Sequence, residues 1–121
     1  MGQYDEIMKR TQWFRDARFG MFIHYGLYSV KATHEWAMSR ECISVEDYRK
    51  YFDCFTAEDY NPKEWAKLAK QAGMKYAVLT TKHHEGFCLF DSALTDYKAK
   101  LTPAGRDLVK ECVEAFRAEG L

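Results

Sequence analysis

Residues 74–87, Met-Lys-Tyr-Ala-Val-Leu-Thr-Thr-Lys-His-His-Glu-Gly-Phe, join a short apolar run to a string of polar side chains. The apolar part suits a strand that is buried on both faces, the usual state of strands in parallel sheets. Residues 21–24, Met-Phe-Ile-His, form a second run of this kind and also end in histidine. Two such strands, each leading into polar residues, predict a parallel α/β architecture.

Helical segments flank the two predicted strands. Residues 61–73 have a capping Asn61, Pro62 at the first helical position and Gly73 as a terminator. Helices are also expected over residues 4–15 and 107–119, and a short helix over 44–52 interrupts the long connection 25–54. The expected buried stripe of the 61–73 helix is Trp65, Leu68, Ala69 and Ala72, and the expected core aromatics are Trp13, Phe14, Trp65 and Phe116.

This order of elements is typical of βα units joined by right-handed crossovers. Two parallel strands alone leave an open edge on each side and too little sheet to cover two helices. We therefore expect residues 1–121 to be an incomplete domain that stops inside a larger barrel or open sheet.

The composition excludes several classes of partner. Lys and Arg number 18 and Asp and Glu number 18, so no basic surface for nucleic acid or acidic membranes is expected. The N-terminal residues contain no apolar run long enough for a signal peptide or a membrane span, which predicts a cytoplasmic protein. Four cysteines without a Cys-x-x-Cys pair are expected to be reduced, mostly packing residues.

Three of the four histidines follow the predicted strands. His24 ends the first strand, and His83 and His84 follow the second. Ligands of parallel α/β folds bind at the carboxyl ends of strands, so these rings should converge on one rim. Any one of them alone would be read more simply as a hydrogen-bonded strand-end residue. Neighbouring strand residues point to opposite faces, so either the chain bends before His83 or one histidine contacts the ligand and the other supports it.

Glu35 and Trp36 lie in the long first connection. A carboxylate beside an indole suits a sugar, because the carboxylate accepts hydroxyl hydrogen bonds and the indole covers the C–H face of the ring. The alternative is a surface glutamate beside a packing tryptophan.

Metal binding is the competing interpretation of the histidines. Neutral imidazoles with Glu85 or Glu35 could hold zinc or another divalent ion. The sequence has no His-x-His or His-Glu-x-x-His pattern, so direct substrate contact is favoured and neither a metal nor a cofactor is expected.

Residues 13–26, Trp-Phe-Arg-Asp-Ala-Arg-Phe-Gly-Met-Phe-Ile-His-Tyr-Gly, resemble the first-strand motif of α-L-fucosidases of glycoside hydrolase family 29. Residues 79–87, Leu-Thr-Thr-Lys-His-His-Glu-Gly-Phe, resemble the second-strand signature of the same family. Segments 55–58, 65–66, 72–73 and 105–109 also occur in the family's order, so the likeness covers nearly the whole chain.

The resemblance implies the first two β/α units of a (β/α)₈ TIM-like barrel, with a preceding N-terminal helix. Family members are retaining exo-glycosidases that remove terminal α-L-fucose from glycans or fucosides through a covalent aspartyl intermediate. That aspartate belongs to a later strand and has no counterpart in this sequence. No cofactor is implied, and assembly of a complete protein into a homo-oligomer is left open.

Carried over residue by residue, the resemblance makes His24, His83 and His84 contacts to fucose hydroxyls. It makes Glu35 and Trp36 the Glu-Trp pair of the sugar pocket, and none of the five residues is the nucleophile. Tyr25 stands where tryptophan is usual and Ala37 where an aromatic residue is common, which leaves open a difference in the pocket wall or in the preference beyond fucose. Two alternatives to the enzyme are a non-catalytic sugar-binding fragment or pseudoenzyme and a His-ligated metal-dependent hydrolase.

Overall fold

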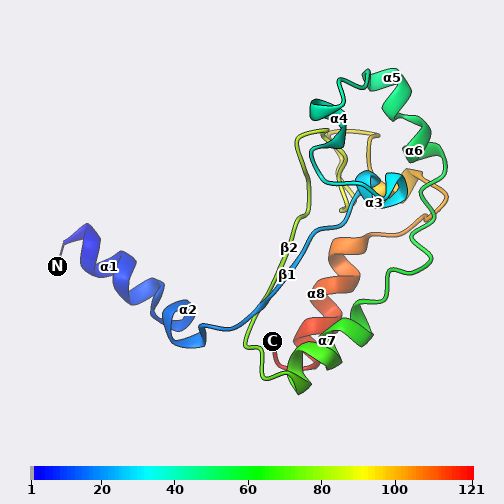
Figure 1. Cartoon of the computed structure of the whole chain (residues 1–121). Helices are drawn as coiled ribbons and strands as arrows, with labels where there is room; N and C mark the ends of the chain where they lie inside the picture. Colours follow the sequence, from blue (N-terminus) through cyan, green and yellow to red (C-terminus); the bar gives the residue numbers. More distant parts are fainter. Residues whose placement is uncertain (1) are drawn as a thin grey trace.

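A computed structural model describes residues 2–121. The strands β1 (Met21–Ile23) and β2 (Ala77–Leu79) pair in parallel, with Phe22 opposite Val78. The helices are α1 (Gln3–Arg10), α2 (Gln12–Ala17), α3 (Leu27–Lys31), α4 (Ala37–Arg40), α5 (Val45–Tyr48), α6 (Lys50–Asp53), α7 (Pro62–Gln71) and α8 (Leu108–Ala118), with a 3₁₀ turn η1 (Ala99–Leu101). The predicted parallel α/β order is confirmed (Figure 1).

The helices α7 and α8 form as the sequence signals indicate. The Asn61 side chain accepts a hydrogen bond from the backbone of Glu64, and Asp107 caps α8 in the same way through Lys110. Beyond α7, Gly73 has a φ of +82°, a conformation that glycine adopts without steric cost.

The predicted buried stripe of α7 is only partly correct. The helix buries Pro62, Ala66 and Ala69, while Leu68 is 58% exposed. Of the predicted stripe, Ala69 is buried, Trp65 is partly buried, and Ala72 is exposed like Leu68.

The expectation that both strands are buried on both faces is wrong for residues 2–121. Met21 and Leu79 pack against the core on the side of α7 and α8, but Phe22 is 64% exposed on the opposite face. The described chain has nothing to cover that face (Figure 1). Side chains alternate along a strand, so His24 follows Phe22 onto the same open face.

The N-terminal segment differs from its prediction in two ways. The single helix expected over residues 4–15 is two helices that meet at Thr11, and neither buries a residue. They extend away from the rest of the chain (Figure 1). Trp13 and Phe14 are 62% and 47% exposed, so their expected place in the core is wrong. Their rings contact Tyr76, which packs so closely on Gly20 that a Cβ there would lie 2.5 Å from the Tyr76 ring.

The long connection from residue 25 to 54 contains four short helices, α3 to α6, in place of the single predicted helix. Ser44 caps α5 as predicted, by accepting a hydrogen bond from the Asp47 backbone. Tyr48 and Phe52 from these helices are buried against a core that includes Phe55 and Phe87. The connection is therefore a packed layer that covers the carboxyl ends of the strands.

Arg106 joins the segment between α6 and α7 to α8. Its guanidinium group donates to the carbonyl oxygens of Ala57 and Tyr60 at 3.0 and 3.1 Å and pairs with Glu111. The Tyr60 hydroxyl group donates to the Leu108 carbonyl at 2.9 Å. Buried polar groups in this region are thus hydrogen-bonded to the backbone.

All four cysteines are free, with Cys88 and Cys112 buried and Cys42 and Cys54 exposed. Within residues 2–121, no helix has both the length and the apolar character needed to cross a bilayer.

Candidate functional site

His24 lies just beyond the carboxyl end of β1, on the open face of the sheet. Its ring stacks on Phe22, with centroids 5.0 Å apart and planes inclined by 25°. The alternation of side chains along the strand produces this stack, because residues two apart share a face.

A single hydroxyl group fixes the backbone around His24. Thr80 Oγ1, just after β2, accepts from the Tyr25 backbone nitrogen at 3.3 Å and lies 3.3 Å from the Ile23 carbonyl, to which it donates. It also lies 3.2 Å from the hydroxyl group of Tyr28. One donor and two acceptors are the full capacity of a threonine hydroxyl, so Thr80 holds both neighbours of His24 in place.

His83 lies at the centre of a group of rings. Its centroid is 6.2 Å from that of His24, 5.7 Å from that of Tyr28 and 5.4 Å from that of Trp36. The chain has left the strand before this point, since β2 ends at Leu79. The structure therefore brings His24 and His83 to one rim, although they are far apart in the sequence.

His84 links the loop that follows β2 to the long connection of residues 25–54. Its ring stacks on Trp36, with centroids 4.6 Å apart and planes inclined by 11°. Its Nε2 atom is 2.9 Å from the backbone oxygen of Glu35. These two contacts place the Glu35-Trp36 pair beside the histidines, so all five predicted residues lie together.

The Glu35 carboxyl group is at the surface of this group. A hydrogen bond from its own backbone amide is the main cause that lowers its pKa, and positive charge on His24 and His83 lowers the pKa further. The Glu35 carboxyl group is therefore stabilised in its ionised form.

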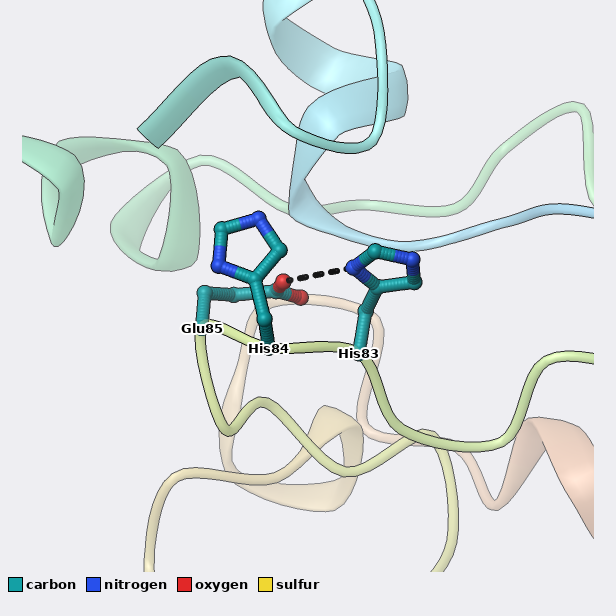
Figure 2. A group of neighbouring side chains, drawn as sticks. All are labelled: His83, His84 and Glu85. Atoms are coloured by element: carbon teal, nitrogen blue, oxygen red, sulfur yellow. Dashed lines mark ion pairs between the residues drawn. The ribbon is translucent and has the colours of Figure 1, made fainter. Parts of the chain in front are cut away.

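Glu85 lies behind the histidines in the chain interior, with a side chain that is 1% exposed. Burial raises the pKa of its carboxyl group. Burial also lowers the pKa of His83, and the charge of His84 adds to that effect. Figure 2 shows the Glu85 carboxyl group directed toward the His83 ring, with the His84 ring pointing elsewhere.

Residues 3–121 match the family model described as alpha-L-fucosidase. The chain belongs to the α-L-fucosidase family. It is 39% identical to rat (Rattus norvegicus) tissue alpha-L-fucosidase over 91% of its own length and 28% of that protein. Alpha-L-fucosidase isoenzyme 1 of Paenibacillus thiaminolyticus is 69% identical, with a TM-score of 0.90 over 93% of this chain and 27% of that one.

A family 29 α-L-fucosidase from Bacteroides thetaiotaomicron, trapped as a covalent intermediate with 2-fluoro-fucosyl fluoride, is 39% identical. Its TM-score is 0.84 over 91% of this chain and 28% of that structure. The chain thus spans a little over a quarter of the length of these α-L-fucosidases. The resemblance seen in the sequence motifs is confirmed at the level of the family.

Among residues 2–121, the group that comes closest to a metal site is His83, His84 and Glu85, whose donor atoms lie within 4.8 Å of one another. Donor atoms around a tetrahedral zinc ion are only about 3.4 Å apart, as follows from zinc–nitrogen bonds of roughly 2.0–2.1 Å. His84 Nε2 is also within hydrogen-bond distance of Glu35 O. A shared ion would require these donor atoms to move closer together.

Sequence reasoning did not identify Tyr28 or Thr80. Tyr28 is 6% exposed, and its hydroxyl group and ring contact Thr80 and His83. No local pattern marks Tyr28, but Thr80 could have been noticed, because the hydroxyl group of a residue at a strand end often satisfies neighbouring backbone groups.

The two departures from the family motif lie away from the histidines. Tyr25 packs inward, with its ring 4.9 Å from Tyr60 and 5.8 Å from Phe55, measured between centroids. Ala37 is 0% exposed. Both side chains thus pack toward the core.

A groove of about 520 Å³ lies between α7 and α8, and none of the histidines line it. The chemistry of this chain is concentrated at the strand ends instead. Three imidazoles, a carboxylate and an indole are gathered there, which are groups of the kind that bind hydroxyl groups and the apolar face of a sugar ring.

Proposed function

We propose that residues 1–121 supply the fucose-binding half-site of a retaining exo-α-L-fucosidase. The observation that carries the proposal is the convergence of His24 and His83 with the Glu35-Trp36 pair at the carboxyl ends of β1 and β2. Hydroxyl groups of the sugar would bind the imidazoles and the Glu35 carboxylate, and Trp36 would cover an apolar edge of the ring.

The proposed architecture is a (β/α)₈ barrel, of which this chain forms the first two β/α units. Such barrels need about 250 residues and place their active sites at the carboxyl ends of the strands. The parallel pairing of β1 with β2 and the uncovered Phe22 face are compatible with this arrangement, because the interior of a barrel would enclose that face.

Catalysis itself would require further residues. A retaining glycosidase uses two carboxyl groups about 5–5.5 Å apart, one as nucleophile and one as acid and base. In this proposal an aspartate on a later strand is the nucleophile, and Glu35 binds the sugar. The histidines orient the substrate, and such orientation contributes several kcal/mol in the transition state.

The test is hydrolysis of an aryl α-L-fucoside by the full-length gene product that contains this sequence, with residues 1–121 alone as the comparison. Hydrolysis by the full-length product only is expected. Turnover by residues 1–121 would contradict the division of roles. Fucose binding without hydrolysis by the full-length product would instead identify a sugar-binding pseudoenzyme.

A further inference from the structure

The Glu85 carboxyl group has no role in the sugar contacts described above, yet it lies directly against the site. Its Oε2 atom and the Nδ1 atom of His83 are both buried, and neither has a hydrogen-bond partner. The two atoms are 3.8 Å apart. Buried polar atoms without partners are rare in folded proteins, so this pair calls for a physical explanation.

The two unsatisfied atoms are complementary. An ionised carboxylate only accepts hydrogen bonds, whereas Nδ1 of a neutral imidazole donates when it carries the proton. A distance of 3.8 Å exceeds the usual 2.7–3.2 Å range, so either a small approach or one bridging water would complete the contact. A direct contact with the ionised carboxylate, or a water that accepts from Nδ1 and donates to the carboxylate, places the imidazole proton on Nδ1.

A third buried atom supports this reading. The hydroxyl oxygen of Tyr48 is also buried without a partner. Burial is the main cause that raises the pKa of Tyr48, and the charge of Glu85 is the next. Buried water typically makes about three hydrogen bonds to groups of this kind.

The orientation of the His83 ring gives the contact a consequence at the site. Figure 2 shows the Glu85 carboxyl group on the Nδ1 side of the ring and the other ring nitrogen, Nε2, on the far side. The tautomer of a histidine is set by the hydrogen bond that one nitrogen makes. A proton held on Nδ1 leaves Nε2 as an acceptor.

We propose that Glu85 is a positioning residue that holds the proton of His83 on Nδ1, so that Nε2 accepts a hydrogen bond from a hydroxyl group of the sugar. The inference rests on the proposed function for the identity of the ligand, but the tautomer of His83 does not depend on it. Glu85 thereby selects a hydroxyl donor at this position of the substrate.

The first experiment needs no variant at Glu85. The full-length protein is labelled with ¹⁵N-histidine, and its ring nitrogens are observed by NMR at about pH 8, where neutral imidazole is expected. The His83→Gln variant identifies the His83 signals by their loss. The proposal predicts the Nδ1-protonated tautomer, and the Nε2-protonated tautomer would overturn it whether or not the protein binds fucose.

The second experiment is a double-mutant cycle on aryl α-L-fucoside hydrolysis with Glu85→Gln and His83→Gln. Glutamine at position 83 keeps a polar group near the Nε2 position but has nothing at Nδ1. Glu85→Gln is expected to lower kcat/KM on the order of 10- to 100-fold. This is the range seen when the residue that is hydrogen-bonded to a metal-bound imidazole is removed. In the His83→Gln background the same change should have little further effect.

The outcomes separate the two proposals. If the wild-type protein neither binds nor hydrolyses fucosides, the proposed function fails while the NMR result still decides the tautomer. If the wild type is active and the two substitutions act additively, Glu85 does not act through His83 and the inference is wrong. Thermal unfolding of each variant establishes that it is folded.

Discussion

Thr80 Oγ1 accepts a hydrogen bond from the backbone nitrogen of Tyr25 across 3.3 Å, which links the end of β2 to the residue that follows His24. The same hydroxyl group contacts the Ile23 carbonyl and the Tyr28 hydroxyl group. The position of His24 therefore depends on a side chain from the neighbouring strand as well as on its own strand.

Replacing Thr80 by valine tests this dependence in the full-length protein. Valine has nearly the same shape but forms none of the three hydrogen bonds, each worth about 0.5–1.5 kcal/mol. We expect Thr80→Val to weaken binding of L-fucose about 10-fold, because His24 loses its fixed position. Calorimetric titration measures the affinity.

Thr80→Ser is the matched control for that change. Serine keeps the hydroxyl group and loses only a methyl group, so its affinity should stay within about threefold of the wild type, given the small volume change. Equal losses in both variants would contradict the role of the hydroxyl group, because serine retains it.

How far the sequence predicts this structure depends on the range of the interactions involved. Strands, caps and the glycine terminators were predictable because Asn61, Asp107 and Gly73 act on residues close by in the sequence. The convergence of His24 with His83 was also predictable, because parallel strands end at one rim.

Long-range contacts were not predictable in the same way. Trp13 and Phe14 lie on an amphipathic pattern that normally indicates a core, but the described chain covers them only with Tyr76. The partnership of Tyr28 with Thr80 joins residues 52 positions apart, and nothing in either local sequence marks it. Tertiary packing decides such contacts, and a single sequence contains no direct signal for them.

The stack of Trp36 on His84 provides a second test. Trp36 is 44% exposed, so its ring is available to a ligand as well as to His84. Trp36→Ala removes both the stack and the apolar surface, and aromatic pairs contribute about 0.5–1.5 kcal/mol beyond their buried area. We expect L-fucose affinity to fall at least fivefold.

Trp13→Ala is a suitable control for that measurement. Trp13 lies on the N-terminal segment, away from the histidines, and is 62% exposed. Its ring contacts those of Phe14 and Tyr76. Its replacement should leave L-fucose affinity unchanged. If Trp36→Ala also leaves it unchanged, Trp36 does not form part of the sugar pocket.

Arg106 is predicted to affect stability and not sugar binding. Arg106→Leu removes two hydrogen bonds to carbonyl oxygens and the pair with Glu111. The carbonyl groups of Ala57 and Tyr60 lose a charged donor, which costs about 1.5–3 kcal/mol per bond when the group is buried and less for this half-exposed side chain. A lower melting temperature of the full-length protein is expected.

The control for Arg106 is Arg117→Leu, at an exposed position on α8. It should change the melting temperature little, because exposed single substitutions usually lie within about 0.5 kcal/mol. A melting temperature that falls equally in both variants would mean that the loss of positive charge, and not the carbonyl contacts, is responsible.

The buried Glu85 carboxyl group makes stability depend on pH in a direction that can be worked out. Burial raises its pKa in the folded state above the ordinary value of 4.5. Between 4.5 and the raised pKa the folded state therefore binds more protons than the unfolded state. Stability then falls as pH rises through this window, because its slope follows the difference in bound protons.

Glu85→Gln removes this titration, so its melting temperature relative to the wild type should increase as pH rises from 4.5 through the raised pKa. His83 and His84 lie beside Glu85, so the comparison is made against the wild type at each pH. Thermal unfolding of both proteins across this range provides the measurement. A constant difference between the two melting temperatures would show that Glu85 titrates as an ordinary surface carboxyl group. Burial behind His83 would then not raise its pKa as expected of a desolvated carboxylate.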